Sequence, residues 1–323
     1  MNTLKEIAEV LKGKQNILIF PHVNMDGDAL GSASGLCKGL RNAGKNAYVL
    51  ISEDIPHNLD YLEKSCCIND DSLMENVDIA IMVDCNGDDR IKGREQAFDR
   101  GVIKICVDHH ESSSSHQEYD YFYCEPDSAA TGELIYLLLC DMGIEPDLDI
   151  AECLYTAITT DTGNFQFSNT SKRSHEITSK FFDIEGFDPR NISTLLYHRR
   201  TFDEFKLENY VMNNLHFYVD GKVAVGSVTQ GLLWTHGCTM DQADSIIQRI
   251  MLLEDVEIGI LIKENENGFF KASLRSKDYA NVAKVAEKFG GGGHAKAAGC
   301  PLGTSIGRIK YDLIQALTEA IER

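Results

Sequence analysis

Short apolar runs alternate with helical patterns through the first half of the chain. The apolar runs predict four strands, at residues 16–20, 47–51, 78–83 and 102–107. Helical patterns predict helices at 29–42, 129–142 and 150–160. Strands that alternate with helices at this spacing are typical of βαβ units, and strands that are apolar on both faces indicate helices on both sides of the sheet. The N-terminal part is therefore predicted to be an α/β domain with a doubly wound, mostly parallel sheet.

The pattern changes after about residue 185. A charged helical segment is followed by strands at 222–228 and 256–263, and Asn267-Gly268 predicts a type I′ turn into a strand at 269–275. Helical patterns at 281–289 and 306–321 complete a smaller α/β domain with more antiparallel pairing. We therefore expect a first domain at 1–187, a helical linker at 188–210 and a second domain at 211–323.

The net charge of the chain limits the kinds of nucleic acid that it is expected to bind. A chain of 323 residues is long enough for two domains, and its net charge is −19. An acidic surface argues against a protein that covers long duplex DNA, because such proteins carry basic faces. Short anionic substrates remain compatible with this charge, since bound divalent cations would reverse the local field.

The sequence also bears on location. No stretch approaches 18 apolar residues, so we expect no membrane contact, and the N-terminus lacks the pattern of a secretory signal. The ten cysteines include no CxxC pair. Reduced thiols in a cytoplasmic protein are the simplest interpretation.

Acidic residues and histidines follow four of the predicted elements. They are His22, Asp26 and Asp28 after 16–20, Asp84 after 78–83, Asp108-His109-His110 after 102–107, and Asp161 after 150–160. Each segment alone could be a turn or a helix cap, and Asp28 fits an N-cap position well. Turns and caps do not explain all four together. In open α/β sheets ligands bind beyond the carboxyl ends of the strands, so we expect one site.

The residue types at these positions indicate a metal site. Carboxylates and imidazoles without thiolates suit manganese, and suit magnesium or zinc less well. A pair of ions needs a bridging carboxylate. Such a pair stabilises both the attacking and the leaving oxygen of a phosphoryl displacement.

These motifs resemble those of a known family. His22-xxx-Asp26-x-Asp28, the lone Asp84, Asp108-His109-His110 and Asp161 resemble the four motifs of the DHH phosphoesterases. Gly290-Gly291-Gly292-Gly293-His294 is similar to the glycine-rich signature of the DHHA1 domain. The resemblance covers nearly the whole chain, and in length and architecture it is strongest to bacterial nanoRNases, which are oligoribonucleases and phosphoadenosine-phosphate phosphatases. Met25 stands where the family often has proline.

The resemblance implies a role for each residue of the first domain. The first ion would be held by His22, Asp26 and Asp84, and the second by Asp28, Asp84, His109 and Asp161, with Asp84 as the bridge. Asp108 would orient a ligand histidine. His110 would contact the scissile phosphate and stabilise its developing charge.

The second domain is expected to hold the substrate. A glycine run allows close backbone approach to a ligand, and a helix starting after it would favour phosphate. The Arg275 guanidinium could bind a phosphate in bidentate fashion. The resemblance supports Arg275, Gly291, Gly292, Gly293 and His294 as substrate contacts.

The implied activity is hydrolysis of short oligoribonucleotides to mononucleotides, and of 3′-phosphoadenosine 5′-phosphate to AMP, with two divalent ions. The resemblance also makes a homodimer plausible. A cyclic or linear dinucleotide phosphodiesterase stays open as an alternative. An inorganic pyrophosphatase would carry a basic C-terminal motif that we do not find. A non-catalytic nucleotide-binding protein would be expected to have lost ligand residues, and none is missing here.

Overall fold

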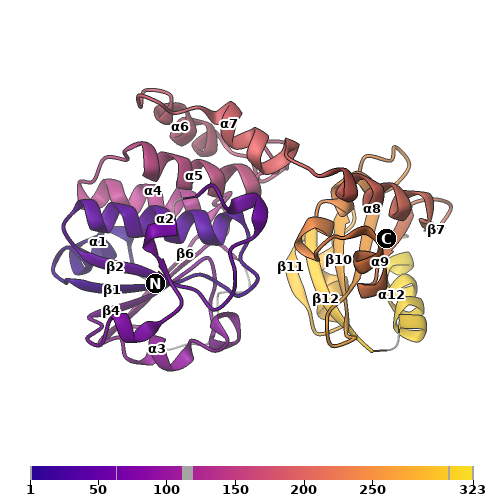
Figure 1. Cartoon of the computed structure of the whole chain (residues 1–323), viewed down its shortest axis with the longest axis horizontal. Coiled ribbons are helices and arrows are strands. Elements are labelled where there is room, and N and C mark those ends of the chain that lie inside the picture. Colours follow the sequence, from indigo (N-terminus) through magenta and orange to yellow (C-terminus); the bar gives the residue numbers. More distant parts are fainter. Residues whose placement is uncertain (1, 63, 111–118, 305, 322–323) are drawn as a thin grey trace. The chain divides into compact units, whose positions relative to one another are not determined.

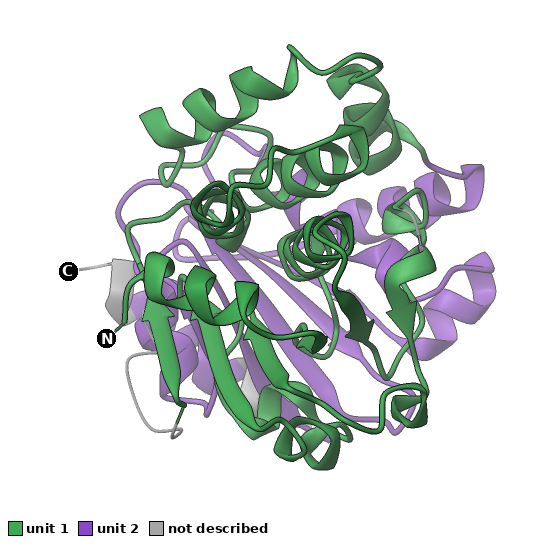
Figure 2. Cartoon of the chain, turned by 90° about the vertical axis from the view of Figure 1, so that its left-hand side faces the viewer, with its two compact units in different colours: residues 1–199 green, residues 200–323 purple. Residues whose placement is uncertain are grey.

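The chain divides into two compact units. The computed structural model describes residues 2–62, 64–110, 119–304 and 306–321. Unit 1 comprises Met1–Arg199 and unit 2 comprises Arg200–Arg323 (Figure 2). Within the described residues, no helix is long and apolar enough to cross a membrane.

Unit 1 contains a six-stranded parallel sheet in the order β3-β2-β1-β4-β5-β6. Its strands are β1 (Asn16–Phe20), β2 (Asn46–Leu50), β3 (Cys67–Ile68), β4 (Ile79–Val83), β5 (Ile103–Asp108) and β6 (Tyr121–Cys124). All five residues of β4 are buried, as expected of a strand that is covered on both faces. The predicted mostly parallel α/β domain is confirmed.

Four long helices cover one face of this sheet (Figure 1). They are α1 (Leu4–Lys12), α2 (Gly27–Asn42), α4 (Thr131–Met142) and α5 (Leu148–Asp161). Ile17 and Ile19 of β1 point into the core beneath them, whereas Leu18 and Phe20 point into a smaller core on the opposite face. That second face is covered more thinly, by α3 (Glu95–Asp99) and the surrounding loops (Figure 1).

The boundary between the two units falls within the segment 188–210 of the chain. Here α7 (Pro189–Ser193) and a π-helix (Thr194–His198) belong to unit 1, and α8 (Phe202–Asn213) belongs to unit 2. Tyr197 ties the π-helix to unit 1, because its hydroxyl donates to the Thr159 carbonyl at 2.9 Å. The helical character of this segment is thus shared between the two units.

Unit 2 contains a mixed sheet in the order β11-β12-β10-β9-β8-β7. Its strands are β7 (His216–Tyr218), β8 (Val223–Val228), β9 (Ile258–Glu264), β10 (Phe270–Ser276), β11 (Gly292–His294) and β12 (Ala297–Gly303). Among the strands of this sheet that the structure describes, only β8 and β9 pair in parallel. The helices are α8, α9 (Gln230–His236), α10 (Ile246–Ile250), α11 (Val282–Glu287) and α12 (Ile306–Ile321). The predicted smaller α/β domain is confirmed.

The turn between β9 and β10 differs from the prediction. A type I′ turn needs positive φ at both central residues, but of Asn267 and Gly268 only Gly268 has it, at 76°. The Asn265 side chain instead accepts from the backbone N–H groups of Asn267 and Phe269, at 3.0 and 2.9 Å. This side chain organises a longer loop and makes a two-residue turn unnecessary.

Candidate metal centre

The predicted ligands of unit 1 meet at the carboxyl edge of the sheet. Strands β1, β4 and β5 are neighbours, so the residues that follow them converge, and the C-terminal end of α5 adds Asp161. Asp84 lies at the centre of the cluster. Its Oδ2 is 3.6 Å from His22 Nε2, and its Oδ1 is 3.6 Å from His109 Nε2. The two oxygens of one buried carboxylate therefore face two different histidines.

The backbone at Asp84 is strained. Its φ is 63°, in the left-handed region that L-residues rarely adopt, and Asn24 in the loop after β1 has a φ of 55°. Conformations of this kind cost about 1–3 kcal/mol each and persist where the surrounding structure enforces them, often at functional sites. The strain therefore marks the two loops that deliver His22, Asp26 and Asp84.

The first group of ligand atoms comes from His22, Asp26 and Asp84, which lie within 4.8 Å of one another. His22 Nδ1 is 2.9 Å from the Val23 carbonyl, which fixes the proton on Nδ1 and leaves Nε2 for the carboxylates. Asp26 Oδ1 lies 3.7 Å from that Nε2. Asp26 is also the N-cap of α2, since it accepts from the Ala29 N–H. The cap position suggested for Asp28 thus belongs to Asp26.

The second group surrounds His109. Its Nε2 lies 3.7 Å from Asp28 Oδ2 and 3.2 Å from Asp161 Oδ2. Its Nδ1 is 3.1 Å from the Ser128 carbonyl and therefore carries a proton, and this contact directs Nε2 at the carboxylates. The structure thus brings together all six residues predicted as metal ligands.

Asp108 lies beside the other histidine of the pair. Its Oδ1 is 2.7 Å from His110 Nδ1 and also accepts from the backbone N–H groups of His109 and His110. We expected Asp108 to orient a ligand histidine, but the ring of His109 is oriented by Ser128. Asp108 instead orients His110, whose Nδ1 is 3.8 Å from Asp84 Oδ1.

The sequence did not predict two residues that orient the ligand side chains. The Thr131 hydroxyl donates to Asp84 Oδ1 at 2.8 Å, and the Ser128 carbonyl holds His109. Both lie in the small-residue segment 128–132 that begins α4. The only signal for them was the position of this segment just before a predicted helix, and a backbone carbonyl has no sequence signature.

The electrostatics of the cluster favour cations. Burial alone would lower the pKa of His22, but Asp26 and Asp84 outweigh it and raise the pKa to about 10. Burial opposes protonation of His109 in the same way, yet Asp161, Asp84 and Asp28 raise its pKa to about 11. Burial, together with Asp84 and Asp161, holds the pKa of Asp28 well above its usual range.

The donor atoms fit divalent cations. Asp28 Oδ1 accepts from Gly132 N–H and the Ser32 hydroxyl, and Oδ2 accepts from Thr131 N–H. A carboxylate has about four lone-pair sites, so one remains on Oδ2, the oxygen that faces His109. Four carboxylates and two imidazoles whose Nε2 atoms face carboxylates form an oxygen and nitrogen donor set that suits a divalent cation.

The predicted substrate residues of unit 2 lie on its sheet. Arg275 of β10 and His294 of β11 both pair with Ala297 of β12, one on each side. Residues paired across strands point to the same face, so Arg275 and His294 share a face and lie about 10 Å apart across two strand spacings. The next row on this face is Ser273, Gly299 and Gly292. Two long side chains therefore flank a floor of small residues.

The glycine run forms a hairpin strand, and the described residues directly after it, 295–303, lead into and form β12 instead of a helix. Residues 295–298, which resemble a helix in composition, connect into and begin β12. A Cβ at Gly291 would lie 2.0 Å from the Gly299 carbonyl, and one at Gly293 would lie 2.5 Å from the Ala297 carbonyl. Close packing of β11 against β12 therefore requires glycine at these two positions and disfavours a helix.

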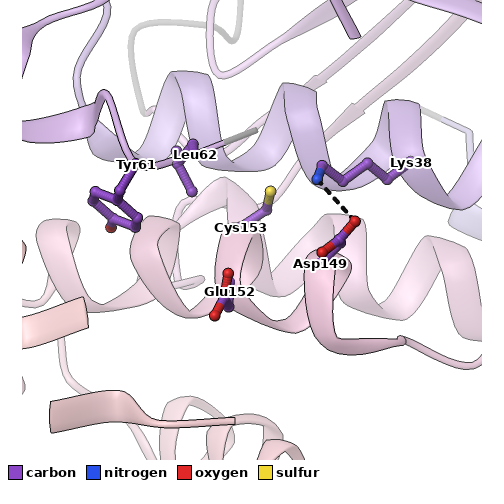
Figure 3. Close-up of a pocket in the computed structure, with 6 residues that line it drawn as sticks. All are labelled: Lys38, Tyr61, Leu62, Asp149, Glu152 and Cys153. Atoms are coloured by element: carbon purple, nitrogen blue, oxygen red, sulfur yellow. Dashed lines mark ion pairs between the residues drawn. The ribbon is translucent and has the colours of Figure 1, made fainter. Parts of the chain in front are cut away.

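A separate pocket lies between α2 and α5 (Figure 3). It has a volume of about 370 Å³ and is lined by Lys38, Tyr61, Leu62, Asp149, Glu152 and Cys153. The Lys38 ammonium is 3.4 Å from an Asp149 carboxylate oxygen. This pocket contains none of the predicted site residues, so it is distinct from the metal centre.

Each of the two units contains a region that matches a known protein family. Residues 16–158 match the DHH family, N-terminal domain, and residues 220–323 match the DHHA1 domain. A bifunctional oligoribonuclease and PAP phosphatase NrnA of Thermus thermophilus is 29% identical over 325 residues, covering 99% of this chain and 95% of the relative. The protein of the same name from Bacillus subtilis is 22% identical, with 92% of each chain covered.

Solved structures show the same fold. An exopolyphosphatase-related protein from Bacteroides fragilis has a TM-score of 0.85 and 25% identity, over 99% of this chain and 95% of that one. An exonuclease RecJ bound to manganese has a TM-score of 0.54 and 17% identity, over 100% and 95% of the two chains. The chain therefore belongs to the DHH family and is a phosphoesterase-type enzyme whose DHH domain is followed by a DHHA1 domain.

Proposed function

We propose that unit 1 holds two divalent cations, with manganese preferred, and that Asp84 bridges them. The observation that carries the proposal is the position of Asp84, whose two oxygens face His22 and His109 at 3.6 Å each. His22 and Asp26 complete the first set of ligands. Asp28, His109 and Asp161 complete the second.

Two such cations would supply a nucleophilic water at neutral pH and a clamp on the reacting phosphate. The other residues of the site then have roles that their contacts suggest. Asp108 holds His110 by Nδ1 at 2.7 Å. Burial works against a charged His110, but Asp108 and Asp84 together raise its pKa. A protonated, oriented imidazole can donate to a phosphate oxygen and stabilise charge that develops there.

We further propose that the substrates are short oligoribonucleotides, cleaved to mononucleotides, and 3′-phosphoadenosine 5′-phosphate, cleaved to AMP. The names of the curated relatives support this substrate class. In unit 2, Arg275 and His294 flank a row of small residues on one face of the sheet. A guanidinium and an imidazole at this separation can bind a phosphate group while a base or ribose lies against the glycines.

A parallel product assay tests the proposal. Metal-free protein is loaded with manganese and given a 5′-labelled RNA dinucleotide, phosphoadenosine phosphate, cyclic di-AMP and pyrophosphate, with Asp84→Ala as control. We expect mononucleotide from the dinucleotide and AMP from phosphoadenosine phosphate, with loss of both activities in the variant.

Three outcomes would contradict the proposal. Hydrolysis of pyrophosphate alone would mean that unit 2 does not bind nucleotides through the face of Arg275 and His294. Near-normal turnover by Asp84→Ala would mean that this residue does not bridge the ions. Preferential cleavage of cyclic di-AMP would favour the dinucleotide phosphodiesterase alternative.

A further inference from the structure

The segment 128–132 contacts the proposed second ion site at several points. The Ser128 carbonyl faces His109 Nδ1 at 3.1 Å, and the N–H groups of Thr131 and Gly132 donate to Asp28 at 2.7 and 2.9 Å. The Thr131 hydroxyl donates to Asp84. Three of the four proposed ligands of the second ion are thus oriented by one short piece of chain, and Asp161 is the exception.

A buried carboxylate, that of Glu133, fixes the position of this segment through hydrogen bonds. Glu133 accepts from the Ser128 hydroxyl at 3.0 Å and from the Ser174 hydroxyl of α6 (Lys172–Phe181) at 2.6 Å. Glu133 has no exposed surface. These bonds fix Ser128 but do not reach Asp161, which comes from the end of α5.

Asn169 connects segment 128–132 to Asp161 by hydrogen bonds. Its Nδ2 donates to the Ala129 carbonyl and to the Asp161 carbonyl, each at 3.0 Å. One amide group therefore joins the segment that orients Asp28, Asp84 and His109 to the residue that carries the fourth ligand. Asn169 is itself exposed, so core packing does not explain it.

We propose that Asn169 is a positioning residue that fixes Asp161 relative to segment 128–132 and so sets the affinity for the second ion. This inference rests on the proposed two-ion site. Supporting residues of metal ligands typically change metal affinity by about 10–100-fold when they are replaced. The first ion, held by His22, Asp26 and Asp84, receives no contact from Asn169 in the described part of the chain and should be unaffected.

The test is a manganese titration of the metal-free full chain, with free Mn²⁺ followed by electron paramagnetic resonance. Asn169→Ala removes the two hydrogen bonds, and Asn169→Asp removes them at constant shape while adding a negative charge. Charge alone would strengthen cation binding in the second variant, whereas lost positioning weakens it in both. Asn191→Asp, at an exposed asparagine of α7, is the matched control for charge.

We expect two ions per chain in the wild type. In both Asn169 variants one ion should keep its affinity and the other should bind about tenfold more weakly or worse. Asn169→Ala should add little further loss in a background of Asp161→Ala, because residues that act together are not additive.

Failure of the proposed function and failure of the inference about Asn169 would give different results. A wild type that binds fewer than two ions would overturn the proposed function, and this inference with it. Two ions with unchanged affinity in Asn169→Ala would overturn the inference alone. The inference would also be wrong if Asn169→Asp bound more tightly than the wild type, or if Asn191→Asp weakened binding equally.

Discussion

Asp84 combines a strained backbone with a buried carboxylate that faces two histidines. A φ of 63° at a non-glycine residue is unfavourable, yet a glycine here would remove the carboxylate. The conformation turns the side chain at the end of β4 so that each oxygen faces a different histidine. The functional geometry is therefore obtained at the expense of local stability.

The glycine run contains positions with different reasons for being glycine. Gly291 and Gly293 are required by the close approach of β11 to β12, but a Cβ at Gly292 would meet no atom of the described residues within 4 Å. Backbone packing therefore does not require glycine at position 292. This position lies on the same face of the sheet as His294.

We predict that Gly292→Ala folds normally but raises KM for phosphoadenosine phosphate by about tenfold, equivalent to ~1.4 kcal/mol of binding, with a smaller effect on kcat. Steady-state kinetics and thermal unfolding measure the two effects. Gly291→Ala, whose Cβ would clash with the Gly299 carbonyl, should lower the melting temperature instead. An unchanged KM in Gly292→Ala would show that no substrate group approaches this glycine.

At the residue scale the sequence was sufficient to predict that the acidic and histidine residues of unit 1 lie close together, because each follows an apolar run whose end is easy to locate. It was insufficient for the residues that orient them. Ser128 acts through its carbonyl and Thr131 through its N–H and hydroxyl. Contacts of this kind depend on where the backbone lies in space, which the types of the residues do not reveal.

At the scale of elements, long apolar strands were predictable and short ones were not. Strand β1 has the predicted bounds, and β4 differs by one residue. Strand β3 has only two residues and was not predicted. The segment that begins β12 was expected as a possible helix because alanine and lysine favour helices. Pairing with the glycine strand decided otherwise, since tertiary contacts override weak local preferences.

The N-terminus of α4 is capped from another helix. Its own N-cap residue, Ala130, provides no side-chain hydrogen bond, and Asp28 of α2 accepts from the first N–H groups instead. The same carboxylate that we propose as a metal ligand therefore stabilises the packing of α2 against α4.

We predict that Asp28→Ala destabilises the metal-free protein by about 1–2 kcal/mol, the usual cost of losing a cap. Asp161→Ala is the matched control, because it removes a carboxylate from the same cluster without removing a cap. That variant should be unchanged or more stable, since Asp161 is one of the groups that raise the pKa of Asp28. Urea denaturation in the presence of a chelator measures both. Equal loss of stability in the two variants would contradict the capping role.

At the scale of the whole molecule, charge distribution explains how a chain with net charge −19 can bind anionic substrates. The carboxylates of unit 1 attract cations, and those cations would present positive charge to a phosphate. The face of unit 2 that we propose to bind substrate contributes Arg275.

The raised pKa values predict that protons and metal ions compete. With pKa values of about 10 for His22 and about 11 for His109, both rings are protonated at neutral pH in the metal-free protein. A metal ion binds only the neutral ring, so manganese affinity should rise with pH up to about these values. Calorimetry in buffers of different ionisation enthalpy should detect proton release, with less release in His22→Ala. Affinity that is independent of pH would mean that these histidines are not ligands.

The most direct test of the account is a crystal structure of the manganese-loaded protein with anomalous scattering. We predict two manganese peaks about 3.5–4 Å apart, the spacing typical of two-metal sites, one on each side of Asp84. His22 and Asp26 should contact one ion, and Asp28, His109 and Asp161 the other. A single peak, or two peaks of which only one is bound by Asp84, would contradict the bridging role on which the proposed function depends.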